Sequence, residues 1–465
     1  MSRFNINTRV SVRTNAVNIA GGDAFALSPE LELVHAVIAT FLKDEFYEGG
    51  QERIDRIKRL AGMVDPLFVA KLALFARREM NLRSVSHLLV GELAKIHSGD
   101  DLVKRAIVAV TERADDMSEI AAVAGLPMTK QMKRGIRNAF LKFDRYALAK
   151  YKGDGKQFGL RNLIRLTRPK VQHATAEQAQ AWSDLIMKKT MTADTWESSI
   201  STASAEEKSG EWERLVKENK LGYMALLRNL NNFIKNDVSV ETVDAVVKKL
   251  TDKAEVAKSK QLPYRFLNAY YAVSGNRKLV DAISEAMDIA VSNVPVFEGK
   301  TLIAVDTSGS MSGDPITKAA PLAAALAKAN DADLIQYNTR VSEYKINSKT
   351  PVIDIAEKIK KEATGGGTAT NVVFEWAQKN GKKYDRIIIL SDNESWSGSA
   401  FDAYKKYRTV ADPFVHAIDV LGYGTVDLKG HKVYHSAGWS DKVLDMIAMN
   451  EKGIGLIAQI EELVV

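Results

Sequence analysis

The chain has 465 residues, of which 46% are hydrophobic, and a formal net charge of +7. This length allows about two to four domains with sizeable cores, and the absence of cysteine excludes disulfides, thiolate metal sites and cysteine nucleophiles. No run approaches the ~18 apolar residues that a membrane-spanning helix needs, and Met1–Gly22 lacks the apolar core of a signal peptide. We therefore expect a soluble, cytoplasmic protein with no membrane partner.

The N-terminal part of the chain reads as an irregular arm followed by many helices. Residues 1–27 are expected to form the arm, and residues 28–295 show helical periodicity almost throughout. Asp65 and Pro66 predict a helix start, after which Phe68, Leu72 and Phe75 share one face. Farther on, the segment Met224–Ile234 repeats the pattern, with Met224, Leu227, Leu230 and Ile234 on one face. Many moderate helices with short breaks suggest stacked helix pairs.

Positive charge is concentrated within this helical region. Residues 1–295 hold 45 Lys and Arg against 36 Asp and Glu, whereas residues 296–465 hold 20 against 22. Thirteen cations face only two acids between residues 130 and 170, a segment that we call the basic belt. Its cations are Lys130, Lys133, Arg134, Arg137, Lys142, Arg145, Lys150, Lys152, Lys156, Arg161, Arg165, Arg168 and Lys170. Such density predicts binding to a polyanion through phosphate contacts.

Aromatic residues are interleaved with the basic belt. Tyr146, Tyr151 and Phe158 could stack on unpaired bases, which would favour RNA as the polyanion. The alternative is a solvated basic surface whose aromatic side chains face the core. His87 lies between apolar residues, and we interpret it as a packed histidine rather than a ligand.

From residue 296 the pattern changes to strands alternating with helices. Strands are predicted at 301–306, 332–337, 341–346, 386–391, 413–420 and 432–436. Helices are predicted at 315–329, 352–361, 370–379, 400–407 and 440–449, with Asp314 as the N-cap of the first. This alternation is typical of an open, mostly parallel α/β sheet, in which ligands bind beyond the carboxyl ends of the strands.

Three loops of this second domain carry oxygen ligands. Asp306, Ser308 and Ser310 follow the first strand, Thr368 lies in a glycine-rich loop, and Asp392 ends the strand at 386–391. Hard oxygen ligands gathered above a sheet suit one divalent, magnesium-like cation. Thr370 is the alternative to Thr368, and three ordinary capped turns are the alternative to a metal site.

Several segments, taken together and in order, resemble the Ro, or TROVE-domain, RNA-binding family. They are Asn81–Leu88, Phe140–Tyr151, Leu160–Lys170, Met224–Leu230, Leu262–Tyr270, the three oxygen-rich loops and Gly422–Thr425. The resemblance implies a TROVE domain at 28–295, built as a ring of HEAT-like helical repeats. It also implies a doubly wound α/β von Willebrand factor A-like domain at 296–465. The three loops resemble the metal-ion-dependent adhesion site of such domains.

The resemblance also implies partners. Family members bind small structured Y RNAs on an outer basic face and single-stranded ends of misfolded RNAs through a central hole, and they can pair with an exoribonuclease in RNA quality control. The best carried-over RNA contacts are Lys150, Lys152, Lys156, Arg161, Arg165 and Arg168. We therefore expect a ring-shaped monomer that binds RNA without being an enzyme.

Two other functions stay open at this point. One is a metal-dependent protein-interaction scaffold for which RNA is incidental. The other is a nuclease, although ligation by Ser and Thr around one ion lacks the clustered carboxylates of two-metal catalysis. High salt distinguishes the scaffold, because a metal-bridged partner would be released by chelation rather than by screening.

Overall fold

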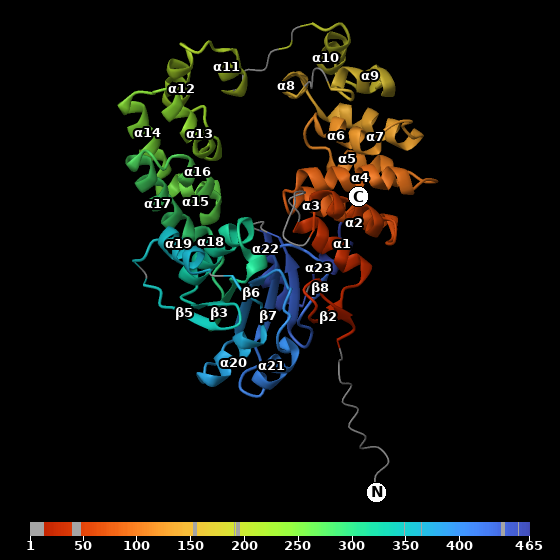
Figure 1. The fold of residues 1–465 in the computed structure, drawn as a ribbon. Coiled ribbons are helices and arrows are strands. Elements are labelled where there is room, and N and C mark those ends of the chain that lie inside the picture. Colours follow the sequence, from red (N-terminus) through yellow and green to blue (C-terminus); the bar gives the residue numbers. More distant parts are fainter. Residues whose placement is uncertain are drawn as a thin grey trace.

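Two arms of packed helices stand on one α/β domain (Figure 1). The computed structural model describes residues 14–39, 48–151, 156–189, 191, 196–347, 349–363, 365–438, 442–453 and 455–465. The first arm contains α1 (Pro29–Ile38), α2 (Gly50–Ala61), α3 (Pro66–Arg78), α4 (Arg83–Ile96), α5 (Leu102–Val110), α6 (Asp116–Ala124), α7 (Lys130–Ala139), α8 (Arg145–Lys150), α9 (Leu160–Thr167) and α10 (Ala176–Ile186). The second arm contains α11 (Trp196–Thr202), α12 (Lys208–Lys217), α13 (Tyr223–Lys235), α14 (Val240–Leu250), α15 (Lys253–Ser259), α16 (Leu267–Ala272) and α17 (Arg277–Ala290), with 3-10 turns η3 (Pro263–Phe266) and η4 (Val291–Asn293).

Helix α3 forms as its sequence predicts. The Asp65 carboxylate accepts a hydrogen bond from the amide of Leu67 at 2.7 Å and so caps the helix, and Pro66 takes the first helical position, where its missing N–H costs nothing. The side chains of Phe68 and Leu72 are buried in the core of the first arm, as is Phe75. The arm is therefore held by one apolar face of each helix packing against its neighbours.

Helix α13 departs from its predicted apolar face at both ends. Leu227 and Leu230 are buried, but Ile234 is 40% exposed and Met224 only half-buried. Phe233 takes the core position instead, because the buried face of the helix has turned by one residue at its C-terminal end.

The α/β domain has the alternation that the sequence predicts. It comprises β3 (Thr301–Asp306), α18 (Asp314–Ala329), β4 (Asp333–Tyr337), β5 (Val341–Tyr344), α19 (Val352–Glu362), α20 (Asn371–Lys379), β6 (Arg386–Ser391), α21 (Ala400–Tyr407), β7 (Phe414–Asp419), β8 (Thr425–Val426), β9 (Val433–Ala437), α22 (Lys442–Glu451) and α23 (Leu456–Glu461). The predicted elements are confirmed within two residues at each end, whereas β8 and α23 were not predicted. The N-cap of α18 is Gly313 rather than Asp314, because a backbone with φ of 82° admits glycine without strain.

Six strands form the main sheet in the order β5-β4-β3-β6-β7-β9. Only β5 runs antiparallel, at one edge. The chain leaves β3 toward β4 and later returns to pair β6 on the other side of β3. The carboxyl ends of β3 and β6 therefore flank the point where the strand order reverses, which is where open α/β sheets bind ligands.

The N-terminal segment differs from the irregular arm expected for residues 1–27. Residues Ala16–Val17 and Asp23–Ala26 form strands β1 and β2, and residues 1–13 lie outside the described part of the chain. Strand β2 pairs with β8 through Phe25 and Val426, so the segment is held by main-chain hydrogen bonds to the α/β domain. The predicted irregularity was wrong for residues 16–17 and 23–26, which pair with each other, and β8, the strand that extends their sheet, is remote in sequence.

Both arms are anchored on the α/β domain, which closes the ring. On the first arm, His35 of α1 contacts Asp419 of β7 at 3.2 Å, and Arg105 of α5 donates to the carbonyl of Val465 at 2.9 Å. On the second arm, Lys328 of α18 pairs with Asp288 of α17 at 2.7 Å. Above the domain the arms run apart and turn toward each other at α10 and α11 (Figure 1). The helical ring with a doubly wound α/β domain is thus confirmed.

Candidate metal centre and basic surface

The structure brings the three oxygen-rich loops together at the reversal point of the sheet. Asp306 ends β3, Ser308 and Ser310 lie in the following turn, and Asp392 follows β6 directly. The side chains of all three loops are buried, Thr368 included. Asp306, Ser308, Ser310 and Asp392 thus lie together beneath the surface, and the hydrogen bond from Gly309 to Gly366 brings the loop that carries Thr368 beside them.

Hydrogen bonds fix the carboxylate of Asp306. The amide of Ser308 donates to its Oδ1 at 2.8 Å, and the hydroxyl of Ser391 donates to its Oδ2 at 2.6 Å. The hydroxyl oxygens of Ser308 and Ser310 lie 3.3 Å apart. Asp306 and both serines are thus held in one orientation before any ligand arrives, which is what a pre-formed binding site requires.

Glycines allow the loop at 365–368 to approach the other two. The amide of Gly309 donates to the carbonyl of Gly366 at 3.0 Å, and Gly366 has a φ of 97° that an L side chain rarely adopts. The carbonyl of Thr368 accepts from the amide of Trp396 at 3.2 Å. A Cβ atom on Gly367 would lie 2.4 Å from the indole ring of Trp396, so only glycine fits between the loops.

Electrostatics at the site favour a bound cation. Burial raises the pKa of Asp392 well above its usual range, and the charge of Asp306 raises it further, while the Ser310 hydroxyl opposes the shift. Burial likewise raises the pKa of Asp306. Within the described residues, Asp392 Oδ2 has no hydrogen-bond partner. Two crowded carboxylates, one with an unsatisfied oxygen, fit a divalent cation that would neutralise both.

Neighbouring acids were missed by the sequence analysis. Glu394 lies two residues after Asp392 and accepts from the amide of Ala20 at 3.1 Å, which ties the N-terminal segment to this loop. Burial raises the pKa of Glu394 to about 7 and that of Asp427 to about 6. Thr370 lies beside Asp427. Thr368 stays our prediction for the cation's third hydroxyl, with Thr370 as the alternative. The spacing Asp-x-Glu was the available signal for Glu394.

The basic belt divides into exposed cations and cations bound by the protein itself. Helices α7 and α9 lie on the outer side of the first arm (Figure 1). The outer basic surface consists of exposed side chains of α7, α9 and the residues after α9, namely Lys130, Lys133, Arg134, Arg165, Arg168 and Lys170. Within the described part of the chain none of these six forms an ion pair shown by the structure. Lys152 lies outside the described residues.

Other belt residues are engaged in structural contacts. Arg137 donates to the carbonyl of Thr167 at 2.9 Å and so joins α7 to the end of α9, and Arg161 donates to the carbonyl of Ile186 at 3.0 Å. Arg145 pairs with Asp184. The bonds of Arg137 and Arg161 satisfy carbonyls at helix ends, and all three contacts join neighbouring helices.

The same holds for Lys142, Lys150 and Lys156. Lys142 donates to the carbonyl of Val108 at 2.9 Å, Lys156 pairs with Glu119 at 3.1 Å, and Lys150 lies over the ring of Tyr151. They contribute positive potential but are less available to an RNA ligand than the exposed six.

The interleaved aromatic residues do not form the expected stacking platform. Phe158 is buried in the core, so its assignment to base stacking was wrong; it is the apolar residue that anchors the start of α9. Tyr151 lies under the guanidinium of Arg113, at 4.3 Å from the ring centroid. Tyr146 is 46% exposed and remains accessible. His87 is buried, which confirms that it is a packed histidine; its Nε2 lies 3.2 Å from Asp116.

None of the helices in the described ranges is both long and apolar enough to cross a bilayer. Family models match two parts of the chain: the TROVE domain matches residues 186–295, and the Ro60 vWA domain matches residues 300–425.

Among similar proteins, the RNA-binding protein RO60 of Caenorhabditis elegans is 27% identical over 244 residues, which cover 46% of this chain and 38% of that protein. The RNA-binding protein RO60 of Deinococcus radiodurans is 29% identical over 203 residues, which cover 38% of each chain. Telomerase protein component 1 of Rattus norvegicus is 23% identical over 292 residues, or 44% of this chain and 11% of that protein. The matched regions thus span well under half of these relatives.

The crystal structure of the Deinococcus radiodurans RO (RSR) protein shares the fold, with a TM-score of 0.64 and 17% identity over 91% of this chain and 100% of that one. The order of the two matched domains along the sequence is the order of the helical ring and the α/β domain in the structure. With both domains matched, this chain belongs to the Ro, or TROVE-domain, protein family and carries a C-terminal von Willebrand factor A-like domain.

Proposed function

We propose that this protein binds small structured, Y-RNA-like RNA on its outer basic surface, takes single-stranded ends of misfolded RNA within the ring, and acts in RNA quality control. The observation that carries the proposal is the set of six exposed cations on α7, on α9 and directly after α9. The relatives named RNA-binding protein RO60 support RNA as the ligand. Phosphate contacts would supply most of the affinity for RNA. The protein would recognise the shape of the A-form helix and would read little of the base sequence.

Salt dependence tests this proposal. The affinity of the protein for an RNA duplex with a single-stranded tail is expected to fall steeply with salt, with a log–log slope of roughly −4 or steeper if four or more of the six cations contact phosphates. Fluorescence anisotropy titrations between ~0.05 and ~0.3 M KCl measure the slope. A slope shallower than about −1 would contradict an electrostatic RNA surface.

We further propose that the three loops hold one divalent cation, Mg²⁺ being the best match to their ligands. Asp306, Ser308, Ser310, Thr368 and Asp392 would hold it, with the carboxylates supplying charge and the hydroxyls neutral oxygens. When bound, the cation supplies a positive charge that a carboxylate of a protein partner could approach. Within the described residues no group of three or more His, Asp or Glu side chains is placed to bind a metal, so the hydroxyls are essential to this proposal.

Within this proposal the protein itself does not cleave RNA. The partner at the metal site would be an exoribonuclease, which degrades the RNA that the ring retains. Incubating the pure protein with labelled RNA and magnesium tests this, because cleavage would show a nuclease instead. The second candidate function is a metal-dependent protein-interaction scaffold, favoured by the buried, pre-oriented Asp306.

Removal of Asp306 tests the metal site. Ligand binding stabilises the folded state by about 2.7 kcal/mol when the free cation is present at 100 times its Kd, so Mg²⁺ is expected to raise the melting temperature of the wild type. Asp306→Ala, or Asp306→Asn if the alanine variant folds poorly, should abolish this increase. Asp402→Ala removes an exposed carboxylate of α21 and serves as the control. Differential scanning fluorimetry with Mg²⁺ and with EDTA measures the effect, and an increase retained by both Asp306 variants would remove Asp306 from the site.

A further inference from the structure

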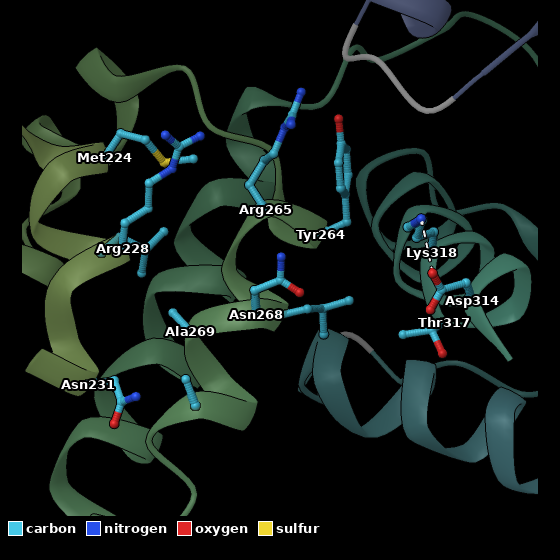
Figure 2. Close-up of a pocket in the computed structure, with 13 residues that line it drawn as sticks. Met224, Arg228, Asn231, Tyr264, Arg265, Asn268, Ala269, Asp314, Thr317 and Lys318 are labelled. Carbon is cyan, nitrogen blue, oxygen red and sulfur yellow. Dashed lines mark ion pairs between the residues drawn. The ribbon is translucent and has the colours of Figure 1, made fainter. Parts of the chain in front are cut away.

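A cavity of about 520 Å³ lies where the second arm meets the α/β domain. Helix α13 forms one wall, η3 and α16 form the middle, and the first turns of α18 form the opposite wall (Figure 2). In Figure 1, α13 and α16 lie on the side of the second arm that faces the first arm. Both domains thus contribute to this cavity, and the proposed functions above do not use it. Its size suits a small ligand or one unit of a polymer.

Cations outnumber acids in the lining of the cavity. Arg228 of α13, Arg265 of η3 and Lys318 of α18 all line it, and Figure 2 shows them on its three walls. Asp314 is the single acid among the described lining residues and pairs with Lys318 at 3.8 Å. Three cations against one acid favour an anionic ligand, and the fork of a guanidinium matches the oxygens of a phosphate.

The remaining lining residues suit a planar base. The ring of Tyr264 is half-buried and stands between the two walls, with the guanidinium of Arg265 at 5.1 Å from its centroid (Figure 2). Met224 adds a polarisable apolar contact. The amides of Asn231 and Asn268 each offer donors and an acceptor, as base edges require. An apolar peptide or a bare phosphate would leave part of this lining unused.

We propose that this cavity binds one unpaired nucleotide, with the base stacked on Tyr264 and its flanking phosphates contacted by Arg228 on one wall and by Lys318 on the other. The inference rests on the proposed function, since a single-stranded RNA end within the ring is the natural source of such a nucleotide, although a free nucleotide has the same chemistry. It adds to that function a defined contact point, built from both domains, at which the single strand is held by its base as well as by its backbone.

The test compares a fluorescein-labelled single-stranded RNA of ten nucleotides with an abasic strand of the same length. Tyr264→Ala is expected to lower the affinity for the RNA about tenfold, because stacking of one base is lost, and to leave the abasic strand unaffected. Tyr264→Phe keeps the ring and should bind like the wild type. Arg228→Gln should lower the affinity for both strands by a similar factor, and it should make the slope of log affinity against log salt shallower by about 1. Arg228 is exposed, so this variant is expected to fold.

Two further arms separate the possible outcomes. In one arm, a nucleoside monophosphate competes with the labelled RNA for the protein. Competition at the wild type but not at Tyr264→Ala would show that the cavity recognises a lone nucleotide. Absence of competition at the wild type would show that the cavity takes a nucleotide only as part of an RNA strand. Arg165→Gln changes a residue of the outer basic surface, so it should lower the affinity for a tailed duplex but not the affinity for the single strand. If Tyr264→Ala and Arg228→Gln bind the ten-nucleotide RNA as tightly as the wild type, the cavity inference is wrong, even where Arg165→Gln behaves as expected.

Discussion

Replacement of Lys130, Arg134 and Arg165 by glutamate is expected to lower the affinity for a tailed RNA duplex by at least about 100-fold at ~0.1 M salt. Each reversal removes one cation that can neutralise a phosphate and adds a charge that repels it, and the release of condensed counterions falls accordingly. The slope of log affinity against log salt should become shallower by about 3. All three side chains are exposed, so the fold should be unaffected.

A matched triple variant controls for net charge. Lys217, Lys235 and Lys248 are exposed on helices α12, α13 and α14 of the second arm, and their replacement by glutamate changes the net charge by the same amount. This variant should lose far less affinity, through long-range repulsion alone, which salt screens. Equal losses in both triple variants would show that the RNA responds to total charge, and the outer basic surface would lose its special role.

Asp116→Ala is expected to destabilise the first arm by about 3 kcal/mol, since it removes the buried acid that Arg77 and Arg83 share and leaves two backbone amides without their acceptor. Arg77 keeps its pair with Glu112, and Arg83 keeps its pair with Asp115. Asp116 is fully buried and accepts from Arg77 at 3.0 Å and from Arg83 at 2.6 Å. The amides of Glu112 and Arg113 also donate to it, at 3.0 and 2.9 Å. This single carboxylate therefore joins α3, α4 and the turn before α6.

The effect of Asp116→Ala should depend on pH. Burial alone would raise the pKa of Asp116, but His87, Arg83 and the two amides more than offset it and hold the pKa well below its usual range. A carboxylate whose pKa is lowered by folding stabilises the protein at pH values above the pKa of the unfolded chain, which is about 3.9 for Asp. This stabilisation is lost progressively as the pH falls below that value. The difference in the free energy of unfolding between the variant and the wild type should thus be largest at pH 5–7 and should shrink below about pH 4.

Urea unfolding followed by circular dichroism measures the loss. Asp101→Ala removes a carboxylate from the same arm, but its pairs with Lys104 and Arg105 are about half exposed. That control should cost less than about 1 kcal/mol. A midpoint for Asp116→Ala no lower than that of Asp101→Ala would show that the buried charges find other partners.

The α/β domain could be predicted from sequence because its signals are local. The central strands β3 and β6 are short, fully buried and mostly apolar runs, and each helix has its own periodicity, so element type follows from a window of about ten residues. The metal loops were predictable for a related reason: the carboxyl ends of adjacent parallel strands meet at one edge, which places Asp306 beside Asp392. The ring could be predicted only from the family resemblance, since the sequence shows no exact repeat that would indicate a ring of helical repeats.

Contacts between remote segments could not be read from the sequence. Strands β1 and β2 are too short to show alternation; they pair with each other, and β8 pairs with β2 from a remote part of the sequence. Arg137 and Arg161 look like free cations in a basic run, but each reaches a helix-end carbonyl that the sequence does not place. Phe158 could not be placed from the sequence, because a basic context does not reveal whether an aromatic side chain in the turn before α9 faces RNA or the core.

The partners of the N-terminal helices are translated long after the helices themselves. His35 contacts Asp419, Lys71 of α3 donates to the carbonyl of Glu461, and Arg105 donates to Val465. Some 360 to 390 residues separate the two members of each pair. Such distant pairings form slowly, because the chain must search a large volume before they are made. On the ribosome, the first arm therefore emerges with its base uncovered, and the circle is completed only after residues 419–465 have been translated.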